Sequence, residues 1–223
     1  MNDNKSAFKS SEYDNKIIQT LPYYYDIYFQ ILDLVRTIKK DSNLSWLDIG
    51  CGTGSLISYV LGKNLHIEEI TLCDTSTEML KIAHSKIDKS VNFINKSALD
   101  LDYHNTFDIV TSVQVNHYLN FEDRIKSIEN SYNALKSNGI FFTVENFAPF
   151  TSMGEDISLN RWKEYQIRNG KSVEDSEKHI SRYNKDYFPI TVTQHLDTLK
   201  SCGFKTVEIF WLSYMQVGFY SIK

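Results

Sequence analysis

A glycine-rich loop places the strongest constraint on how this chain can fold. Residues 47–54 read LDIGCGTG, the apolar run 45–49 predicts a buried strand, and residues 53–62 predict a helix. Glycines at a strand-to-helix turn carry no Cβ, so the backbone can approach a ligand closely. The free N–H groups at the start of the helix favour an anionic group such as a carboxylate. The loop therefore predicts a ligand site at the end of the strand.

The apolar runs after this loop predict alternating strands and helices. Further strands are expected at 69–73, 91–94, 107–113 and 140–144. Helices are expected at 76–87 and 121–136. Ser76 is a good N-cap for the first of these helices, and Asn138 with Gly139 ends the second. Such alternation is typical of an α/β fold with a parallel sheet and helices on both faces.

Helices are also expected on either side of the alternating region. Apolar residues recur at three- and four-residue steps over 13–40, which predicts two helices broken at Pro22. Residues 158–170 and 172–186 predict two polar helices, and 191–202 a third helix after them. The two polar helices fit a cap over the edge of the sheet better than a layer of the core.

These elements predict a single domain over 1–223. Its expected parts are an N-terminal helical lid over 1–44 and an inserted helical cap over 148–190. Two aromatic-rich strands, 205–214 and 215–222, close the chain. Only a short turn separates these two strands, so they must pair antiparallel.

Charge and cysteine usage narrow the classes of function. The net charge is −4 and no dense Lys/Arg block appears, whereas proteins that bind nucleic acid usually carry a basic stripe. The three cysteines, Cys51, Cys73 and Cys202, are far apart and form no CxxC pair. This pattern argues against both a disulfide framework and a zinc site. No metal is expected, and His179 and His195 are expected at the surface. The polar N-terminus and the lack of a long apolar run predict a cytoplasmic protein with no membrane contact.

An acidic residue after the second strand adds to the signal of the loop. Asp74 follows Gly54 by about 20 positions, where a carboxylate can accept hydrogen bonds from two ribose hydroxyls. The loop has the spacing GxGxG, whereas the dinucleotide fingerprint is GxGxxG. The pair of features therefore predicts a nucleoside-containing ligand and disfavours NAD.

The loop and Asp74 together resemble the class I S-adenosylmethionine (SAM)-dependent methyltransferases. The resemblance covers roughly 45–145 and implies a Rossmann-like sheet of seven strands, the last antiparallel. It implies that Asp48 helps to hold the amino group of SAM, that Asp74 with its neighbour Thr75 belongs to the cofactor site, and that the loop cradles the methionine part through Gly50, Cys51, Gly52 and Gly54.

The resemblance continues downstream of Asp74. Residues 96–101 stand where the family often has a Gly-Asp-Ala stretch that touches adenine. Ser97 and Ala98 are the implied adenine residues, and Ser97 replaces the usual Asp, which changes that contact. Gln114, after the fourth strand, is also assigned to the cofactor site.

The N-terminal segment is similar to the lid of the carboxy-SAM synthases, a subgroup that serves transfer-RNA wobble-uridine modification. Tyr13 and Tyr24 lie in the stretch that carries this similarity, and Tyr24 is the closest match to a lid tyrosine that binds the cofactor carboxylate. Tyr24 is equally compatible with a helix residue that faces the core. The GCGTG loop departs from that subgroup, and neither Arg168 nor Arg182 matches its substrate arginine, so simple methyl transfer is favoured.

Candidate catalytic residues follow the fourth and fifth strands. Ligands bind at the carboxyl ends of strands in open α/β sheets, which points to Gln114, Asn116, His117 and Tyr118 and to Glu145. His117 is a candidate general base because an imidazole titrates near neutral pH. Two alternatives stay open, because His117 could fill a helix start and Glu145 could pair with a cation. Many methyltransferases also work by positioning alone.

The sequence as a whole predicts a SAM-dependent methyltransferase that acts on a small-molecule acceptor by direct displacement. One alternative is a carboxy-SAM synthase-like or transfer-RNA-modifying enzyme, which needs a carboxylate-binding arginine or a basic patch. Another is a non-catalytic SAM-binding regulator, which would have no acceptor cavity. The sequence names neither the acceptor nor the oligomeric state, of which a homodimer is one option.

Overall fold

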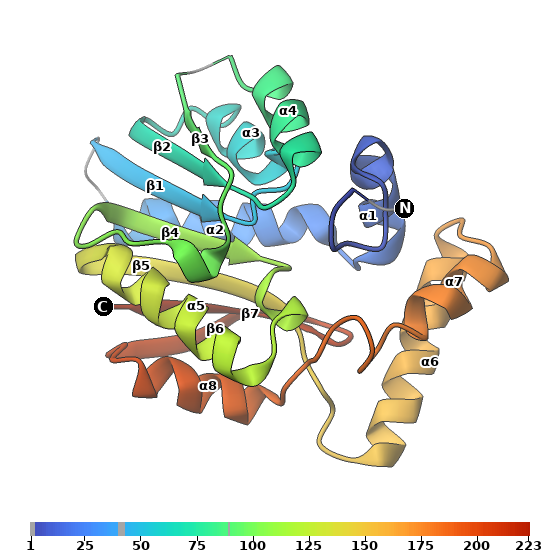
Figure 1. Ribbon diagram of the computed structural model, residues 1–223. Coiled ribbons are helices and arrows are strands. Elements are labelled where there is room, and N and C mark those ends of the chain that lie inside the picture. Colours follow the sequence, from blue (N-terminus) through green and yellow to red (C-terminus); the bar gives the residue numbers. More distant parts are fainter. Residues whose placement is uncertain (1–2, 40–42, 89) are drawn as a thin grey trace.

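Seven strands form one mixed sheet in the computed structural model, which describes residues 3–39, 43–88 and 90–223. The strand order is β3-β2-β1-β4-β5-β7-β6 (Figure 1). Strands β1 to β5 run parallel, and β7 runs antiparallel to both β5 and β6. The strands are β1 Leu44–Ile49, β2 Ile67–Cys73, β3 Asn92–Ile94, β4 Phe107–Val113, β5 Leu135–Asn146, β6 Thr206–Ser213 and β7 Gln216–Ile222. The predicted α/β fold, with seven strands and the last one antiparallel, is confirmed.

Helices cover both faces of the sheet. On one face α2, α3 and α4 pack into a core around Trp46, and on the other α5 and α8 pack around Phe141. Because both faces are covered, β1 is buried along its whole length, as is usual for parallel sheets. The helices are α1 Tyr13–Thr20, α2 Tyr24–Ile38, α3 Ser55–Leu61, α4 Thr77–Lys86, α5 Phe121–Ala134, α6 Ser152–Arg168, α7 Val173–Ile180 and α8 Val192–Ser201, with the short 3-10 turns η1 Ser10–Glu12, η2 Ala98–Asp100 and η3 Asn116–Tyr118.

Local chemistry sets several of the helix boundaries. The Ser76 hydroxyl accepts a hydrogen bond from the Met79 N–H at 3.2 Å, so the predicted N-cap of α4 is confirmed. Pro22 lies between α1 and α2, as expected, and the chain turns there through Tyr23 at a φ of 54°. Helix α6 begins at Ser152, six residues before the expected start, because the Thr151 side chain caps it.

The boundary between α5 and β5 differs from the prediction. The helix ends at Ala134, two residues before the expected end, and β5 begins at Leu135. Leu135 is fully buried and pairs with Phe107 of β4, so burial of this leucine in the sheet outweighs one more helical turn. The register of the pairing then shifts before Ile140.

Two histidines are buried where a surface position was expected. His195 of α8 is 0% exposed and packs against Phe147 and Phe219, with ring centroids 5.2 and 5.1 Å apart. His179 of α7 is 9% exposed and packs edge-on against Trp162. Burial lowers the pKa of His195 to about 3, so its ring stays neutral and packs as an aromatic group. The expectation that both residues lie on the surface is wrong.

Helices α6 and α7 stand beyond the carboxyl ends of the strands, with α1 beside them (Figure 1). Trp162 of α6 donates its indole N–H to the Thr20 carbonyl at 2.7 Å, which ties α6 to α1. None of the helices in the described part of the chain is both long and apolar enough to cross a bilayer. The division into lid, core and cap stays a prediction.

Candidate cofactor and acceptor site

The glycine loop joins β1 to α3 through backbone conformations that favour glycine. Gly50 and Gly52 have φ values of 65° and 54°. A Cβ on Gly50 would lie 2.4 Å from Val115, so the loop packs closely against the segment after β4. A Cβ on Gly52 would meet no protein atom within 4 Å. Gly52 therefore borders open space on the side where a ligand can approach.

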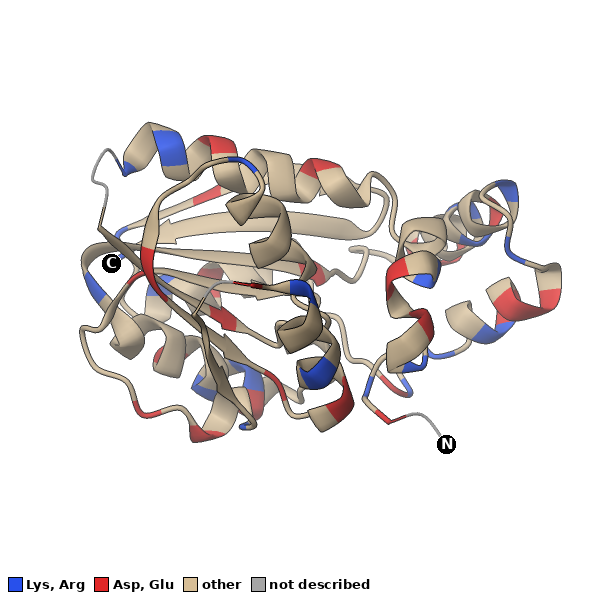
Figure 2. Ribbon diagram, turned by 90° about the horizontal axis from the view of Figure 1, so that it is seen from above, with Lys and Arg blue, Asp and Glu red and all other residues tan. Residues whose placement is uncertain are grey.

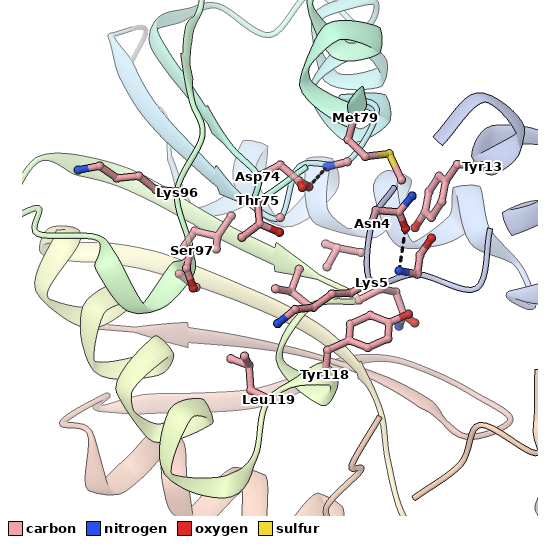
Figure 3. A pocket seen from close by; sticks show the side chains of 18 residues that line it. Asn4, Lys5, Tyr13, Asp74, Thr75, Met79, Lys96, Ser97, Tyr118 and Leu119 are labelled. Carbon is pink, nitrogen blue, oxygen red and sulfur yellow. Dashed lines mark hydrogen bonds between the residues drawn. The ribbon is translucent and has the colours of Figure 1, made fainter. Parts of the chain in front are cut away.

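A cavity of about 110 Å³ opens at the carboxyl ends of β1, β2 and β4 (Figure 3). It is lined by most of the residues that the sequence assigned to the cofactor: Tyr13, Gly50, Gly52, Asp74, Thr75, Ser97, Ala98 and Gln114. The other assigned residues that border a hollow, Tyr24, Asp48 and Cys51, line a smaller adjoining one. Gly54 lines neither: it has a φ of 74° at the start of α3, and a Cβ there would lie 3.0 Å from Ala83. Their roles as cofactor residues stay predictions.

Asp74 organises the turn that follows β2. Its carboxylate accepts hydrogen bonds from the Gly52 N–H at 2.9 Å and the Ser76 N–H at 2.8 Å. Burial raises the pKa of Asp74, and the backbone N–H groups partly oppose that shift. The carboxylate thus links the glycine loop to the start of α4, at the rim of the cavity (Figure 3).

Asp48 and two tyrosines meet in the smaller hollow. Asp48 is 3% exposed and accepts a hydrogen bond from the Thr111 hydroxyl at 2.6 Å. Burial raises the pKa of Asp48 to about 7, so a cation beside it would stabilise its charged form. The hydroxyls of Tyr24 and Tyr28 are hydrogen-bonded to each other near Asp48.

The far side of the cavity is built by η2. The Ser97 hydroxyl accepts a hydrogen bond from the Leu99 N–H at 3.2 Å and so caps this turn. Ala98 is buried beside it, and Met79 and Leu119 add apolar surface to the lining. The apolar side chains on this side suit a heterocycle, which is what the prediction for Ser97 and Ala98 requires.

The predicted catalytic residues separate into two groups. Tyr118 lines the cavity, whereas His117 and Glu145 are 1% and 0% exposed and line none of the described hollows. The Glu145 carboxylate accepts from the N–H groups of Asn116 and His117, from His117 Nδ1 at 2.7 Å and from the Thr143 hydroxyl. The pair therefore binds the backbone of η3, and its catalytic role stays a prediction.

Electrostatics keep this pair in one protonation state at neutral pH. Burial lowers the pKa of His117, and the hydrogen bond to Glu145 only partly offsets that shift. Burial alone would raise the pKa of Glu145, but His117 and Arg124 hold it below its usual value. A neutral imidazole therefore donates to a charged carboxylate.

Residues of the N-terminal segment, defined here as 3–9, line the cavity, although no sequence pattern singled out any residue of this stretch. Asn4, Lys5 and Ser6 all lie in the lining (Figure 3). The Asp3 carbonyl accepts from the Ser76 hydroxyl at 3.0 Å, and the Lys5 carbonyl accepts from Arg182 Nη2 at 3.1 Å. A polar stretch with no apolar period carries no signal of such contacts, because they depend on distant partners.

A second, larger groove of about 710 Å³ adjoins the cavity. The two share Asn4, Lys5, Ser6 and Tyr118, so the groove runs from the cavity toward α7. Its outer wall carries Lys178, Arg182 and Lys185. Arg182 was considered in the sequence as a substrate arginine, and here it lies beside Tyr118, whose pKa its charge and hydrogen bond lower against the larger effect of burial.

The site fits SAM. Gly52 leaves room for a ligand over the loop, Asp74 offers a carboxylate at the rim, and Asp48 places an acidic group where an ammonium would favour its ionisation. Among the described residues, no group of three His, Cys, Asp or Glu side chains could hold a metal ion.

Comparison with known proteins agrees with this geometry. Residues 47–143 match the family described as a methyltransferase domain. The carboxy-S-adenosyl-L-methionine synthase of Staphylococcus epidermidis is 25% identical, and the alignment covers 98% of this chain and 96% of that protein. The synthase of Nautilia profundicola is 24% identical, covering 90% of this chain and 86% of that one.

Solved structures of methyltransferases share the fold. The plantazolicin methyltransferase BpumL, in complex with a desmethyl analogue and SAH, has a TM-score of 0.71 at 16% identity, covering 96% of this chain and 90% of that chain. A SAM-dependent methyltransferase of Thermotoga maritima has a TM-score of 0.63 at 15% identity, covering 96% and 95%. Residues 47–143 therefore form a methyltransferase domain, and the chain as a whole has the fold of SAM-dependent methyltransferases.

Proposed function

We propose that the protein transfers the methyl group of SAM to a small-molecule acceptor by direct displacement. The observation that supports this most is the continuity of two hollows, because the cavity beside the glycine loop opens past Tyr118 into the larger groove. A cofactor in the first would face an acceptor in the second. A non-catalytic SAM-binding regulator would need no such second space.

The residues of the site would then divide the work of binding. Asp74 would accept hydrogen bonds from the ribose hydroxyls, Asp48 would favour the amino group, and Ser97 with Ala98 would border adenine. When bound, SAM supplies an electrophilic methyl group on a positively charged sulfur. A lone pair of the acceptor forms the new bond to that carbon, and the electrons of the broken S–CH₃ bond remain on sulfur.

Positioning would supply most of the catalysis. The buried pair His117–Glu145 holds the backbone of η3, from which Tyr118 reaches the junction of the two hollows. We favour a positioning role for the pair because neither side chain lines a hollow. Tyr118 is the remaining predicted catalytic residue that can contact an acceptor. Alignment of two reactants away from water is a sufficient source of rate for this reaction class.

Calorimetric titration followed by a transfer assay tests the proposal. Purified protein should bind SAM and S-adenosylhomocysteine in the micromolar range, and should move labelled methyl from SAM to members of a panel of phenols, amines, thiols and carboxylates. A folded protein that binds neither compound would contradict the proposal, as would binding without transfer to any class of acceptor.

A second candidate function is carboxy-SAM synthesis. It is supported by the relatives of that name, which align over nearly the whole chain, and by the position of Arg182 beside Tyr118, where it could pair with a carboxylate. Mass spectrometry of the cofactor extracted from freshly purified protein separates the two functions. A SAM derivative heavier by one carboxylate group would favour the synthase, whereas unmodified SAM or S-adenosylhomocysteine would favour methyl transfer.

A further inference from the structure

The larger groove beside the cavity is strongly basic in a protein whose net charge is negative. Of the residues that line it, Lys5, Lys178, Arg182 and Lys185 are cationic, and Asp186 is anionic. The whole chain, by contrast, has 24 Lys and Arg residues against 28 Asp and Glu. The excess of positive charge is therefore local, and it faces the space that the proposed function gives to the acceptor.

Arg182 lines this groove and hydrogen-bonds Tyr118 there. Its Nε donates to Asp186 at 2.7 Å and its Nη2 to the Lys5 carbonyl at 3.1 Å, and both contacts fix its position. A guanidinium has five N–H donors, so these bonds do not exhaust it. Its side chain is 15% exposed, which makes it a partly desolvated cation at the wall of the groove.

The neighbouring hollow extends the positive region. Lys171 is 8% exposed, and burial lowers its pKa to about 8, with Lys16 and Arg182 adding to the shift and Asp175 opposing it. Burial also lowers the pKa of His179, and Lys171 and Arg182 lower it further. The basic side chains of Lys9, Lys16, Lys171, Lys178 and Arg182 line this hollow, against the acidic side chains of Glu12 and Asp175.

We infer that the groove binds the anionic group, a carboxylate or a phosphate, of the methyl acceptor, with Arg182 as the central contact and Lys178 and Lys185 beside it. This inference rests on the proposed methyl transfer and names the class of its substrate. Tyr118 separates the anion from the cofactor cavity, so the acceptor carries its nucleophilic atom and its anionic group on opposite sides of that ring.

A small anion suits this groove better than a nucleic acid. In the view of Figure 2, Lys and Arg residues alternate with Asp and Glu residues along the ribbon, whereas a face that binds nucleic acid usually carries a basic stripe. The groove is also bounded, because the N-terminal segment forms one wall and the segment after α7 the other.

Charge-neutral variants of matched size test the inference. The groove variant combines Lys178→Gln and Lys185→Gln, two exposed positions that line the groove. The control variant combines Lys126→Gln on α5 and Lys200→Gln on α8, which removes the same charge away from the groove. The complex with S-adenosylhomocysteine is titrated with inorganic phosphate and with malonate. The groove variant should bind both anions at least about fivefold more weakly than the control, and both variants should bind S-adenosylhomocysteine as the unaltered protein does.

Acceptor pairs that differ only in an anionic group provide the functional readout. In the transfer assay, 4-hydroxybenzoate and 4-hydroxybenzyl alcohol form one such pair. The acid should be the better acceptor, and the groove variant should raise its KM about tenfold without changing kcat. Equal anion binding in the groove and control variants overturns the inference. The inference is also overturned if neither phosphate nor malonate binds, while mixed transfer RNA binds to the unaltered protein and not to the groove variant.

Failure of the proposed methyl transfer and failure of the anionic-acceptor inference give different experimental results. Absence of S-adenosylhomocysteine binding contradicts the proposed function, and phosphate titration of the protein alone still tests the groove. Binding of S-adenosylhomocysteine with no effect of the groove variant on any anion contradicts the anionic acceptor alone.

Discussion

The carboxylate of Asp74 holds two backbone N–H groups, one from the glycine loop and one from the start of α4. It is also the side chain that borders the cavity where two ribose hydroxyls are expected. One residue thus shapes the loop and offers the ligand contact. Its substitution must therefore be judged by affinity and stability together.

The variant Asp74→Asn should lower the affinity for SAM by about 10- to 100-fold, because an amide replaces charge-assisted hydrogen bonds with neutral ones. Calorimetry measures the change. Asp102→Asn, at a side chain that is 92% exposed, is the matched control and should leave affinity unaltered. Equal affinities for the two variants would contradict the role assigned to Asp74.

Asp48 gives a prediction on stability and pH. Its folded-state pKa, raised by burial to about 7, exceeds the ordinary value of 3.8, so the neutral form stabilises the fold. That contribution is complete below about pH 4 and is lost as the pH rises through about 7. The variant Asp48→Asn stays neutral and can still accept from Thr111. Without SAM, its melting temperature relative to the unaltered protein should therefore rise between pH 4 and pH 7, then level off.

Scanning calorimetry of both proteins across that range checks the sign. Asp88→Asn, at a residue of the connection between α4 and β3, serves as a control that should show no such trend. A melting-temperature difference for Asp48→Asn that does not change with pH would show that the carboxyl is not titrating in this window.

At the scale of elements, η3 shows how a short turn is held in place. Glu145 at the end of β5 accepts its first two N–H groups, and the His117 carbonyl accepts from the Phe188 N–H at 2.7 Å. Ser127 of α5 donates to the Asn116 side chain at 2.8 Å. The turn is thereby fixed from three separate segments, and Tyr118 is carried with it.

Glu145→Gln should destabilise the protein by about 2–4 kcal/mol. The amide removes a buried charge, and its NH₂ group would face the N–H donors that the carboxylate now accepts from. The folded-state pKa of Glu145 is lowered, so its stabilising contribution is lost as the pH falls below the usual value of about 4.5. The loss measured by urea denaturation should therefore shrink at low pH. Glu208→Gln, at an exposed position of β6, should change stability little.

His117→Asn separates positioning from general-base catalysis. The asparagine side chain can keep the donor toward Glu145 but has no basic nitrogen. If the residue positions η3, kcat should stay within about threefold and its pH profile should not change. A loss of about 10²- to 10⁴-fold, with removal of one limb of the profile, would instead establish the imidazole as a base.

Elements of the sheet could be predicted from the sequence because their signals are local. The loop between β1 and α3, the N-cap at Ser76 and the antiparallel last pair all follow from short stretches. Tertiary packing decided the rest. Helix α5 ends earlier than predicted because Leu135 is buried in the sheet. His179 and His195 are buried because aromatic residues from distant segments surround them. The wall made by Asn4, Lys5 and Ser6 had no sequence signal at all.

At the scale of the molecule, the N-terminal segment lines a cavity that is otherwise built by residues far from it in sequence. It bonds to Ser76 near β2 and to Arg182 after α7, which are far apart in sequence. It therefore bridges the sheet and the helices α6 and α7 over the entrance to the site.

Deletion of residues 2–8 should open the cavity without disturbing the sheet, whose strands begin at Leu44. The dissociation rate of S-adenosylhomocysteine, followed by stopped-flow fluorescence, should rise about tenfold or more because one wall is removed. The unfolding free energy should fall by only about 1–2 kcal/mol, because Phe8 is the one apolar side chain of this stretch that packs against both the core and the ring of His179. An unchanged dissociation rate would mean that the segment does not retain the ligand.

The place of β7 in the sheet has a consequence for synthesis on the ribosome. Although β7 follows β6 in the chain, it lies between β5 and β6 and is the strand that joins them. Until residues 216–222 have been translated, β5 has an unpaired edge and β6 has no neighbour in the sheet. A chain in which β7 has not yet docked exposes the backbone edge of β5, which is the condition under which chaperones bind and aggregation starts.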